Sequence, residues 1–238
     1  MGTTHRHYQQ QALAEDFTAS ASRYDLLCRL NPGYHKHLLE SAGRLQLARN
    51  PRVLDLCCGT GLSTDAILKA HPDAEVTAVD ASEGMLAVAR TKPRLHDVRF
   101  VLGDASDPIS LGIRGPFDAI FMAYGIRNVA DKDECLVRLH ALLTADGLLG
   151  VHEYTLDGRR RSELVWKAVT TAVVMPLGRA LTGSTTLFRY LKQSVMDFDR
   201  VDDLARRLCR AGFGVPTVHE VDGWQRGIVH MLVARKSS

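Results

Sequence analysis

The chain has 238 residues, a formal net charge of +3 and a hydrophobic fraction of 45%. These values fit one large domain, or one domain with an appended lid, and they give no reason to expect nucleic acid as a partner. We find no signal peptide and no apolar run of membrane-spanning length, so we expect a cytoplasmic protein with at most peripheral membrane contact. The five cysteines lack metal-ligand spacing, which favours reduced thiols and predicts no metal site.

Strands and helices are predicted to alternate through the middle of the chain. We expect residues 1–8 to be disordered and residues 9–49 to form two or three helices, broken by the Asn-Pro-Gly sequence at 31–33. The pattern then predicts strand 52–56, helix 62–71, strand 75–80, helix 82–91, strands 97–102 and 117–122, helix 131–144 closed by Gly147, and strand 147–154. Such alternation is typical of an α/β fold, and we expect a Rossmann-like, seven-stranded, mostly parallel sheet with helices on both faces.

Residues 158–190 interrupt this alternation. Apolar residues and small residues are mixed in this segment, which we interpret as helices joined by a flexible apolar loop and inserted above the sheet as a substrate lid. A buried helical hairpin that only completes the core is the alternative. Helix 200–211 and strands near 215–221 and 226–235 follow. The chain thus divides into an N-terminal helical segment (1–50), a core (51–155), the lid (156–198) and a C-terminal part that completes the sheet (199–238).

A glycine-rich turn follows the first predicted strand. The sequence Gly59-Thr60-Gly61 lets the backbone approach a ligand closely, because glycine has no Cβ and accepts a positive φ. The helix behind the turn offers unpaired N–H groups. No lysine follows, as a phosphate loop requires, and the third small residue of a dinucleotide fingerprint is poorly matched. The turn therefore predicts a small-molecule site of another kind.

Three aspartates stand at or near the ends of successive strands. Asp55, just before the turn, would repel a pyrophosphate but suits an ammonium group. Asp80 lies about 20 residues past the turn, where doubly wound folds hold ribose hydroxyls, and Asp104 can accept a hydrogen bond from an adenine amino group. Each alone could cap a helix or close a turn. Together they predict S-adenosylmethionine as the ligand, with S-adenosylhomocysteine as its product.

With the strand ends placed, the chain resembles the class I adenosylmethionine-dependent methyltransferases. More narrowly, it resembles the C-methyltransferases of menaquinone and ubiquinone biosynthesis. The resemblance is carried by Phe17 with Tyr24-Asp25 and the segment from Gly33 to Lys36, by Val53–Gly61, by Tyr124–Val129 with Asp131-Lys132, and by Pro176–Gly178 with Tyr190-Leu191 and Ser194-Val195. Two departures are Ala123, where the family has a serine, and Cys28, where it has an asparagine.

The resemblance also implies roles for individual residues. It places Thr60, Asp80, Asp104 and Ala105 against the cofactor, and we expect Ala81, Met85 and Ala123 beside them. It further implies that Arg127 and Asn128 face the reacting ring.

Methylation of a hydroquinone carbon needs an electron-rich ring, so the site must help to remove a phenol proton or stabilise the phenolate. A guanidinium stays protonated, and we therefore expect Arg127 to hold a water and stabilise the phenolate rather than take the proton itself. The alternative for Arg127 is a surface salt bridge with Asp131 or Asp133. Asn128 either orients the same water or caps the helix that starts near residue 131.

Three further residues are candidates at the acceptor site. His152 ends a strand at the same rim and could accept a phenol proton, although such a histidine can also be structural. Tyr24 and Tyr124 could line the ring pocket or belong to the core.

The sequence thus predicts a methyltransferase that acts on a lipophilic aromatic or quinol-type small molecule, most simply at carbon, and that can form a homodimer. A methyltransferase of secondary metabolism acting on O, N or C is one alternative. Another is a protein that binds the same cofactor but catalyses a rearrangement or cyclisation, and a third is a protein that only binds it.

Overall fold

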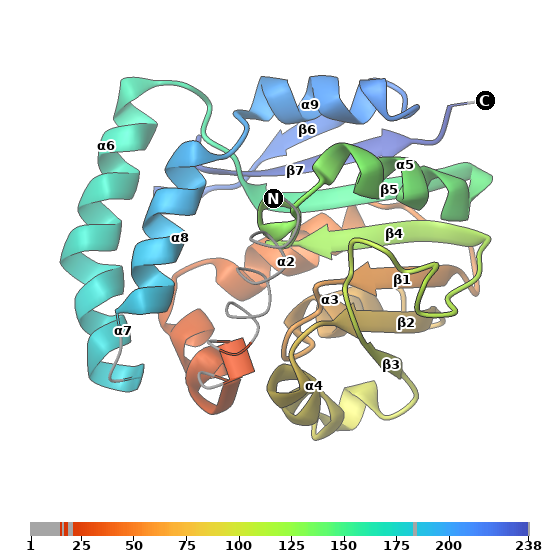
Figure 1. Ribbon diagram of the computed structural model, residues 1–238, viewed down its shortest axis with the longest axis horizontal. Coiled ribbons are helices and arrows are strands. Elements are labelled where there is room, and N and C mark those ends of the chain that lie inside the picture. The colour runs from red at the N-terminus through yellow and green to blue at the C-terminus, as the bar shows by residue number, and fades with distance from the viewer. Residues whose placement is uncertain (1–14, 16, 19–20, 183–184, 238) are drawn as a thin grey trace, which may run out of the picture.

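A computed structural model describes residues 15, 17, 18, 21–182 and 185–237. The strands are β1 (Arg52–Leu56), β2 (Glu75–Asp80), β3 (Arg99–Leu102), β4 (Phe117–Ala123), β5 (Leu143–Tyr154), β6 (Thr217–Glu220) and β7 (Val229–Arg235). They form one sheet in the order β3-β2-β1-β4-β5-β7-β6, parallel except where β7 pairs with β5 and β6. The predicted seven-stranded, mostly parallel α/β sheet is confirmed (Figure 1).

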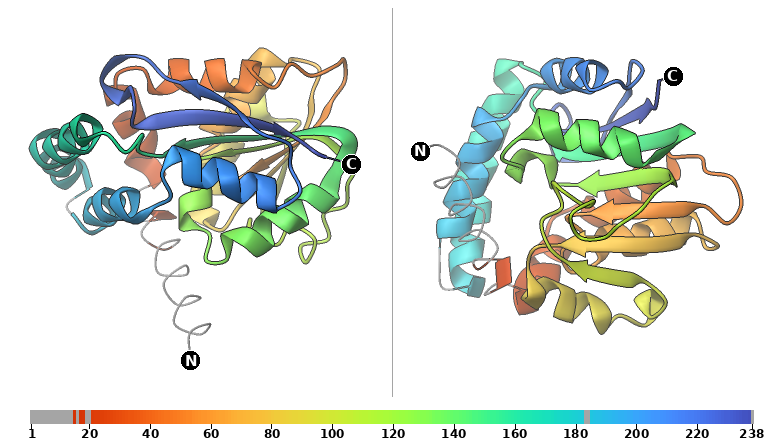
Figure 2. Two further views of the ribbon diagram at one scale, coloured as in Figure 1. Left: turned by 90° about the horizontal axis from the view of Figure 1, so that it is seen from above. Right: turned by 45° about the vertical axis from the view of Figure 1, so that its right-hand side comes forward.

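Helices cover both faces of the sheet, as predicted. They are α2 (Tyr34–Gly43), α3 (Leu62–Ala70), α4 (Glu83–Arg90), α5 (Lys132–Leu142), α6 (Arg160–Val169), α7 (Met175–Thr182), α8 (Thr186–Asp197) and α9 (Val201–Arg210), and residues 21–30 are also helical. Helix α2 lies on one face, and α5 and α9 lie on the other (Figure 2). Helices α6, α7 and α8 stand apart, as a layer beyond the carboxyl ends of the parallel strands (Figure 1).

The core forms because side chains along each strand point alternately to the two faces. Leu54 and Leu56 of β1 join the cluster that contains the leucines of α5 and α9, whereas Val53 joins the cluster with Leu38 of α2 and Ile67 of α3. These five side chains are fully buried or nearly so. The packing holds four adjacent parallel strands, β3-β2-β1-β4, so that their carboxyl ends share one edge, where open parallel sheets bind ligands.

The segment predicted as a lid contains a long helical rod and α8, and the link between them at residues 183–184 lies outside the described residues. Helices α6 and α7 are continuous through a π-helical turn, η3 (Thr170–Val174). The rod packs closely on α8 at Gly178. A Cβ at this position would lie 2.3 Å from the ring of Phe188, so the contact requires glycine. The alternative of a buried hairpin is wrong, since Leu164 and Val173 of the rod are 66% and 54% exposed.

The rod also corrects the statement that no membrane-length apolar run exists. Helix Arg160–Leu181 is long and apolar enough to cross a membrane by length and hydropathy, and only 17% of its most apolar window is buried inside the protein. The sequence pattern concealed this because polar threonines and Gly178 are spaced along the apolar residues.

The junction between α5 and β5 differs from the expectation as well. We expected the helix to reach residue 144 and to be closed by Gly147, but α5 ends at Leu142 and Leu143 already pairs with Phe117 of β4. The register then shifts before Leu148, so the intervening residues form an irregularity within the strand. The disorder expected for residues 1–8 concerns a segment outside the described residues.

Candidate functional site

A cavity of about 470 Å³ opens at the shared edge of the strands. Its size falls within the range of about 300–1,000 Å³ that is typical of small-molecule sites. Of the residues predicted to bind a cofactor, those that line this cavity are Gly59, Thr60, Asp80, Ala81, Met85, Asp104, Ala105 and Ala123. They come from the ends of β1, β2, β3 and β4 and, for Met85, from the first turn of α4, so the structure brings together residues that lie far apart in the sequence.

Asp80, the last residue of β2, holds the glycine turn in place. Its Oδ2 accepts a hydrogen bond from the backbone N–H of Gly59 at 2.8 Å, and its Oδ1 accepts one from the backbone N–H of Ser82 at 2.9 Å. Burial raises the pKa of the Asp80 carboxyl, while these backbone hydrogen bonds lower it. A carboxylate has about four acceptor sites, so Asp80 can still accept hydrogen bonds from two hydroxyls in the cavity.

The two glycines of the turn serve different purposes. A Cβ on Gly59 would meet nothing within 4 Å, so this residue faces open space in the cavity. A Cβ on Gly61 would lie 2.5 Å from Leu95 Cδ1, and φ at Gly61 is 81°, so this glycine is required for packing and for the backbone turn into α3. Gly61 is not among the residues that line the cavity.

Asp55 lies beneath the cavity rather than in its wall. The hydroxyls of Ser63 and Thr64 donate to its Oδ2 at 2.8 and 2.6 Å, and its Oδ1 has no hydrogen-bond partner among the described residues. Burial raises the pKa of this fully buried carboxyl to about 7. In this arrangement Asp55 fixes the first turn of α3, and its side chain is not among those that line the cavity.

The N-terminal helical segment covers the same cavity. Asp25 accepts a hydrogen bond from Thr60 Oγ1 at 2.6 Å and pairs with Lys92 Nζ at 2.7 Å. Phe17 and Tyr24 contribute to the lining. This segment is therefore attached directly to the glycine turn.

A second cavity of about 350 Å³ adjoins the first. The two share the side chains of Phe17, Tyr24, Tyr34, Tyr124 and Asn128, so they lie side by side at these residues. Beyond these shared side chains, the wall of the second cavity is mainly apolar and comes from residues 21–30 and from the rod and α8. Its members include Leu27, Leu30, Trp166, Val169, Val173, Val174, Leu177, Leu187, Phe188 and Leu191.

Arg127 lies in the wall of the second cavity and is held by two buried or half-buried partners. Its Nε is 3.5 Å from Oε1 of Glu153, a fully buried carboxyl at the end of β5, and its Nη1 donates to Ser194 Oγ of α8 at 2.7 Å. Burial raises the pKa of Glu153, and the positive charge of Arg127 lowers it. The surface salt bridge with Asp131 or Asp133 is wrong, since Asp131 caps α5 and Asp133 pairs with Arg207.

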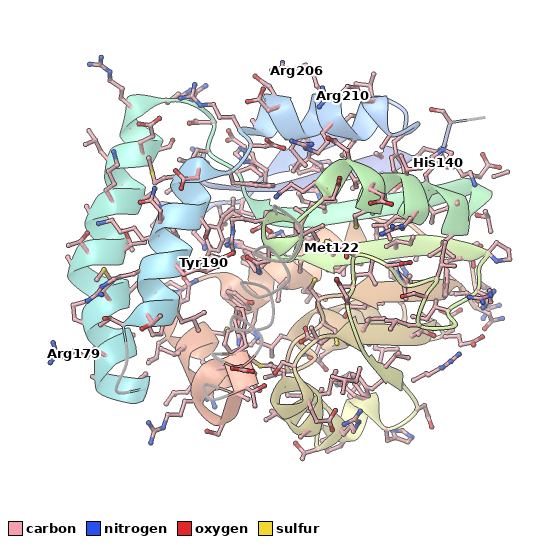
Figure 3. All side chains as sticks on the ribbon, viewed as in Figure 1. Met122, His140, Arg179, Tyr190, Arg206 and Arg210 are labelled. Carbon is pink, nitrogen blue, oxygen red and sulfur yellow. The ribbon has the colours of Figure 1, made fainter. Side chains whose placement is uncertain are left out.

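Asn128 lies where the two cavities meet. Its Oδ1 accepts hydrogen bonds from Arg127 Nη1 and from the Tyr190 hydroxyl of α8, both at 3.0 Å. Figure 3 labels Tyr190 on α8. Asn128 does not cap α5, because the Asp131 side chain accepts the hydrogen bond from the Glu134 N–H. The capping alternative is therefore wrong.

His152 is completely buried and lines neither cavity. Its Nδ1 is 2.8 Å from Ser41 Oγ and its Nε2 is 2.9 Å from the Tyr124 hydroxyl. Burial lowers the pKa of His152 to about 3, so the ring is neutral at physiological pH. Tyr124 has a φ of 56° and stacks on Tyr34, with ring centroids 5.3 Å apart. His152 thus holds Tyr124 in position from behind.

Sequence reasoning missed several residues at this site. Tyr34 and Cys57 line the first cavity, and Glu153 and Ser194 hold Arg127. Ser194 stood in a stretch that carried the family resemblance, but no local pattern indicates that α8 approaches the end of β4. Glu153 was not predicted as a site residue, although a carboxyl in a buried strand is itself a signal that a cation lies nearby.

The chain was also compared with known proteins. The model of the ubiE/COQ5 methyltransferase family matches residues 5–236. The chain is 35% identical to a demethylmenaquinone methyltransferase of Thermus thermophilus, over 84% of this chain and 91% of that protein. It is 29% identical to the ubiquinone/menaquinone biosynthesis C-methyltransferase UbiE of Pseudomonas aeruginosa, over 93% of this chain and 91% of that one.

Among solved structures, the fold is similar to that of Haemonchus contortus phosphoethanolamine N-methyltransferase 2 in complex with S-adenosyl-L-methionine, with a TM-score of 0.61 at 15% identity, covering 85% of this chain and 53% of that one. The fold, the cavity at the strand ends and the match along nearly the whole sequence agree. The chain belongs to the ubiE/COQ5 methyltransferase family.

Proposed function

We propose that this methyltransferase transfers a methyl group from S-adenosylmethionine to a ring carbon of a lipophilic quinol-type acceptor. The observation that carries the proposal is that a cavity lined by Thr60, Asp80 and Asp104 adjoins a more apolar cavity at Tyr124 and Asn128. A polar cofactor and a greasy acceptor could meet there. The names of the relatives, which are quinone-biosynthesis methyltransferases, support the same class of acceptor.

The first cavity suits the cofactor for reasons that its residues supply. Asp80 retains acceptor sites for ribose hydroxyls, and Asp104 lines the wall near the end of β3. The open space at Gly59 leaves room for a ligand against the backbone. When bound, S-adenosylmethionine supplies a methyl group on a positively charged sulfur, and the protein mainly has to align the acceptor with it. The proposed reaction needs no metal.

On the acceptor side, Tyr24, Tyr34 and Tyr124 would hold the ring at the junction, and the apolar wall beyond would take its substituent. We propose that Arg127 lies against a ring oxygen. Because the guanidinium stays charged, it would stabilise the phenolate, and a preorganised donor of this kind contributes about 3 kcal/mol. The phenol proton would pass to a water held by Arg127 and Asn128 and from there to solvent. After the methyl group has transferred, the methylated ring carbon would lose its own hydrogen as a proton to water, and the ring oxygen would take up a proton, which restores the aromatic ring.

Glu153 and His152 act through other residues in this scheme. Glu153 would hold Arg127 at the correct angle from behind, and His152 would hold Tyr124. We therefore propose both as positioning residues. The net charge of +3 gives no reason to expect nucleic acid as a partner, and we propose that the protein acts on its small-molecule acceptor in the cytoplasm.

The proposal is tested by incubating the protein with methyl-labelled S-adenosylmethionine and hydroquinones that carry or lack an alkyl chain. We expect release of S-adenosylhomocysteine and label on a ring carbon, located by NMR. Label on a ring oxygen would favour an O-methyltransferase. A changed acceptor without S-adenosylhomocysteine would favour the rearrangement or cyclisation alternative.

A further inference from the structure

The outer face of the α6–α7 rod carries an apolar stripe. Exposed apolar residues recur at every fourth position along the rod, and they are Leu164, Ala168, Ala172, Pro176 and Ala180. In a regular α-helix, with about 3.6 residues per turn, such a stripe would wind around the axis. The wider π-helical turn η3 at the middle of the rod reduces this winding, so the stripe remains along one side.

No element of the fold covers this stripe among the described residues. The rod uses its other side to pack on α8, through Trp166, Thr170 and Gly178, which are buried. The rod lies at the outer edge of the molecule, with α8 between it and the sheet, in Figure 1 and in the left view of Figure 2. Contiguous apolar surface of this kind marks a site of interaction.

Basic residues flank the stripe. Three arginines, Arg159, Arg160 and Arg161, stand at the start of α6, and Arg179 projects outward near the other end of the rod (Figure 3). Residues 168–178 between them contain no charge. The rod has a single acidic residue, Glu163, which lies 3.4 Å from Arg200 Nη2. An apolar face bordered by cations complements an anionic lipid surface.

We infer that the α6–α7 rod docks this protein on an anionic lipid bilayer, with the apolar stripe in the headgroup boundary and the arginines on the phosphates. A second copy of the chain is the less suitable occupant. In a twofold dimer the same patch meets itself, and each set of arginines would then face the cations of its partner.

The docked rod would also lie beside the entrance for the acceptor. Val169, Val174 and Leu177 of the same rod line the second cavity from its inner side. A lipid-dissolved acceptor could therefore move from the bilayer into the cavity along one helix. This last step rests on the proposed function, whereas docking itself does not.

The test measures flotation of the full chain with vesicles of phosphatidylcholine, with and without phosphatidylglycerol. We expect binding to the anionic vesicles that falls as salt is raised. The double variant Leu164→Asp/Ala172→Asp should bind at least tenfold more weakly. The matched control is Val137→Asp on α5, since Val137 is 56% exposed and lies on another helix, and it should bind as wild type does. Each of Arg160→Gln and Arg161→Gln should weaken binding about fivefold.

Four results would overturn docking. The first two are the absence of vesicle binding by the wild type and an equal loss of vesicle binding in the Val137 control. The other two are vesicle binding that resists high-salt and alkaline washing, as that of a membrane-spanning helix does, and a dimer in light scattering that the double variant dissociates. Methyl transfer to a short-chain, water-soluble acceptor separates the two proposals. It should be unchanged in the double variant, and if it is absent in wild type while the vesicles still bind, only the proposed function fails.

Discussion

The two cavities that meet at Tyr124 are built in different ways. The first cavity, which we propose holds the cofactor and call the cofactor cavity, is formed by a backbone turn and by side chains at the ends of neighbouring parallel strands, such as Asp80 and Asp104. The second, which we propose holds the acceptor and call the acceptor cavity, is formed by side chains from helices separated by more than a hundred residues in sequence, such as Tyr24 and Leu177. The first kind of site leaves a local signal in the sequence, whereas the second exists only after the helices have packed.

The largest expected effect falls on the cofactor cavity. Asp80→Ala should weaken S-adenosylmethionine binding by about 3 kcal/mol or more, because it removes the ribose acceptors and leaves the N–H groups of Gly59 and Ser82 unpaired. Isothermal titration calorimetry measures the change. Asp97→Ala, whose side chain is 88% exposed, is the control and should bind normally. Tight binding by the Asp80 variant would remove that residue from the ribose site.

The corresponding change on the acceptor side should affect turnover alone. Arg127→Ala should lower kcat about 100-fold, which corresponds to the loss of about 3 kcal/mol of phenolate stabilisation, and should leave the cofactor Kd nearly unchanged. Because the alanine also leaves Glu153 buried without a cation, Arg127→Lys is the second variant, since it keeps the charge but not the planar fork. Arg206→Ala on exposed α9 is the control. Unchanged turnover in both Arg127 variants would exclude this residue from the mechanism.

The two cavities also differ in how much of each could be predicted from the sequence. The strands, α3 and the aspartates at the strand ends were predictable because hydrophobic periodicity and the glycine turn are local features. The rod was not, because Pro176 and Gly178 are typical of loops. Here Pro176 lies two residues after the end of the π-helical turn, where the hydrogen-bond pattern already departs from an α-helix, and Gly178 allows contact with Phe188. Such reasons depend on tertiary packing and could not be read from the sequence.

A third prediction concerns pH and the carboxyl beneath the cofactor cavity. Burial raises the pKa of Asp55 to about 7 in the folded protein, above its usual 3.8. The folded state then binds the proton more tightly than the unfolded state, so this contribution to stability is complete below about pH 4 and is lost as the pH rises through 7. Relative to Asp55→Asn, the wild type should lose about 2 kcal/mol of unfolding free energy between pH 5 and 7.

Chemical denaturation at several pH values measures this difference. The exposed Asp146→Asn on β5 is the control and should follow the wild type at every pH. The contribution of His152 to stability should change with pH in the opposite direction. Burial lowers the pKa of His152 to about 3 in the folded protein, so its contribution to the free energy of unfolding is lost as the pH falls. Parallel curves for wild type and Asp55→Asn would mean that Asp55 stays ionised in the folded protein.

A smaller effect is expected in the apolar wall of the acceptor cavity. Leu177→Ala removes three carbon atoms from that wall and should cost about 1–2 kcal/mol in acceptor binding, seen as a raised KM. The loss should occur with an acceptor that carries an alkyl chain and vanish with one that lacks it. Leu164→Ala, on the outer face of the same rod, is the control with a soluble acceptor. Equal loss for both acceptors would place the alkyl chain elsewhere.

The smallest effect is expected for a change in backbone strain. Two non-glycine residues with positive φ, Tyr124 and Cys57, lie beside the cavities. Tyr124, with φ at 56°, is held by the His152 hydrogen bond and by the Tyr34 ring, whereas Cys57, with φ at 57°, is held by packing against Gly125 and the core cluster of β1. A non-glycine residue in the left-handed region of φ and ψ costs about 1–2 kcal/mol of stability. Substitution by glycine removes this cost, but part of the gain in stability is offset because glycine loses more entropy on folding. Cys57→Gly should therefore raise the unfolding free energy by about 1 kcal/mol or less, measured by thermal denaturation. Cys57→Ala removes the thiol but keeps the strained backbone, so it should not stabilise the protein. Equal stabilisation by the alanine and glycine variants would mean that the thiol, and not the positive φ, is the source of strain. The backbone of the turn after β1 would then carry no measurable strain energy.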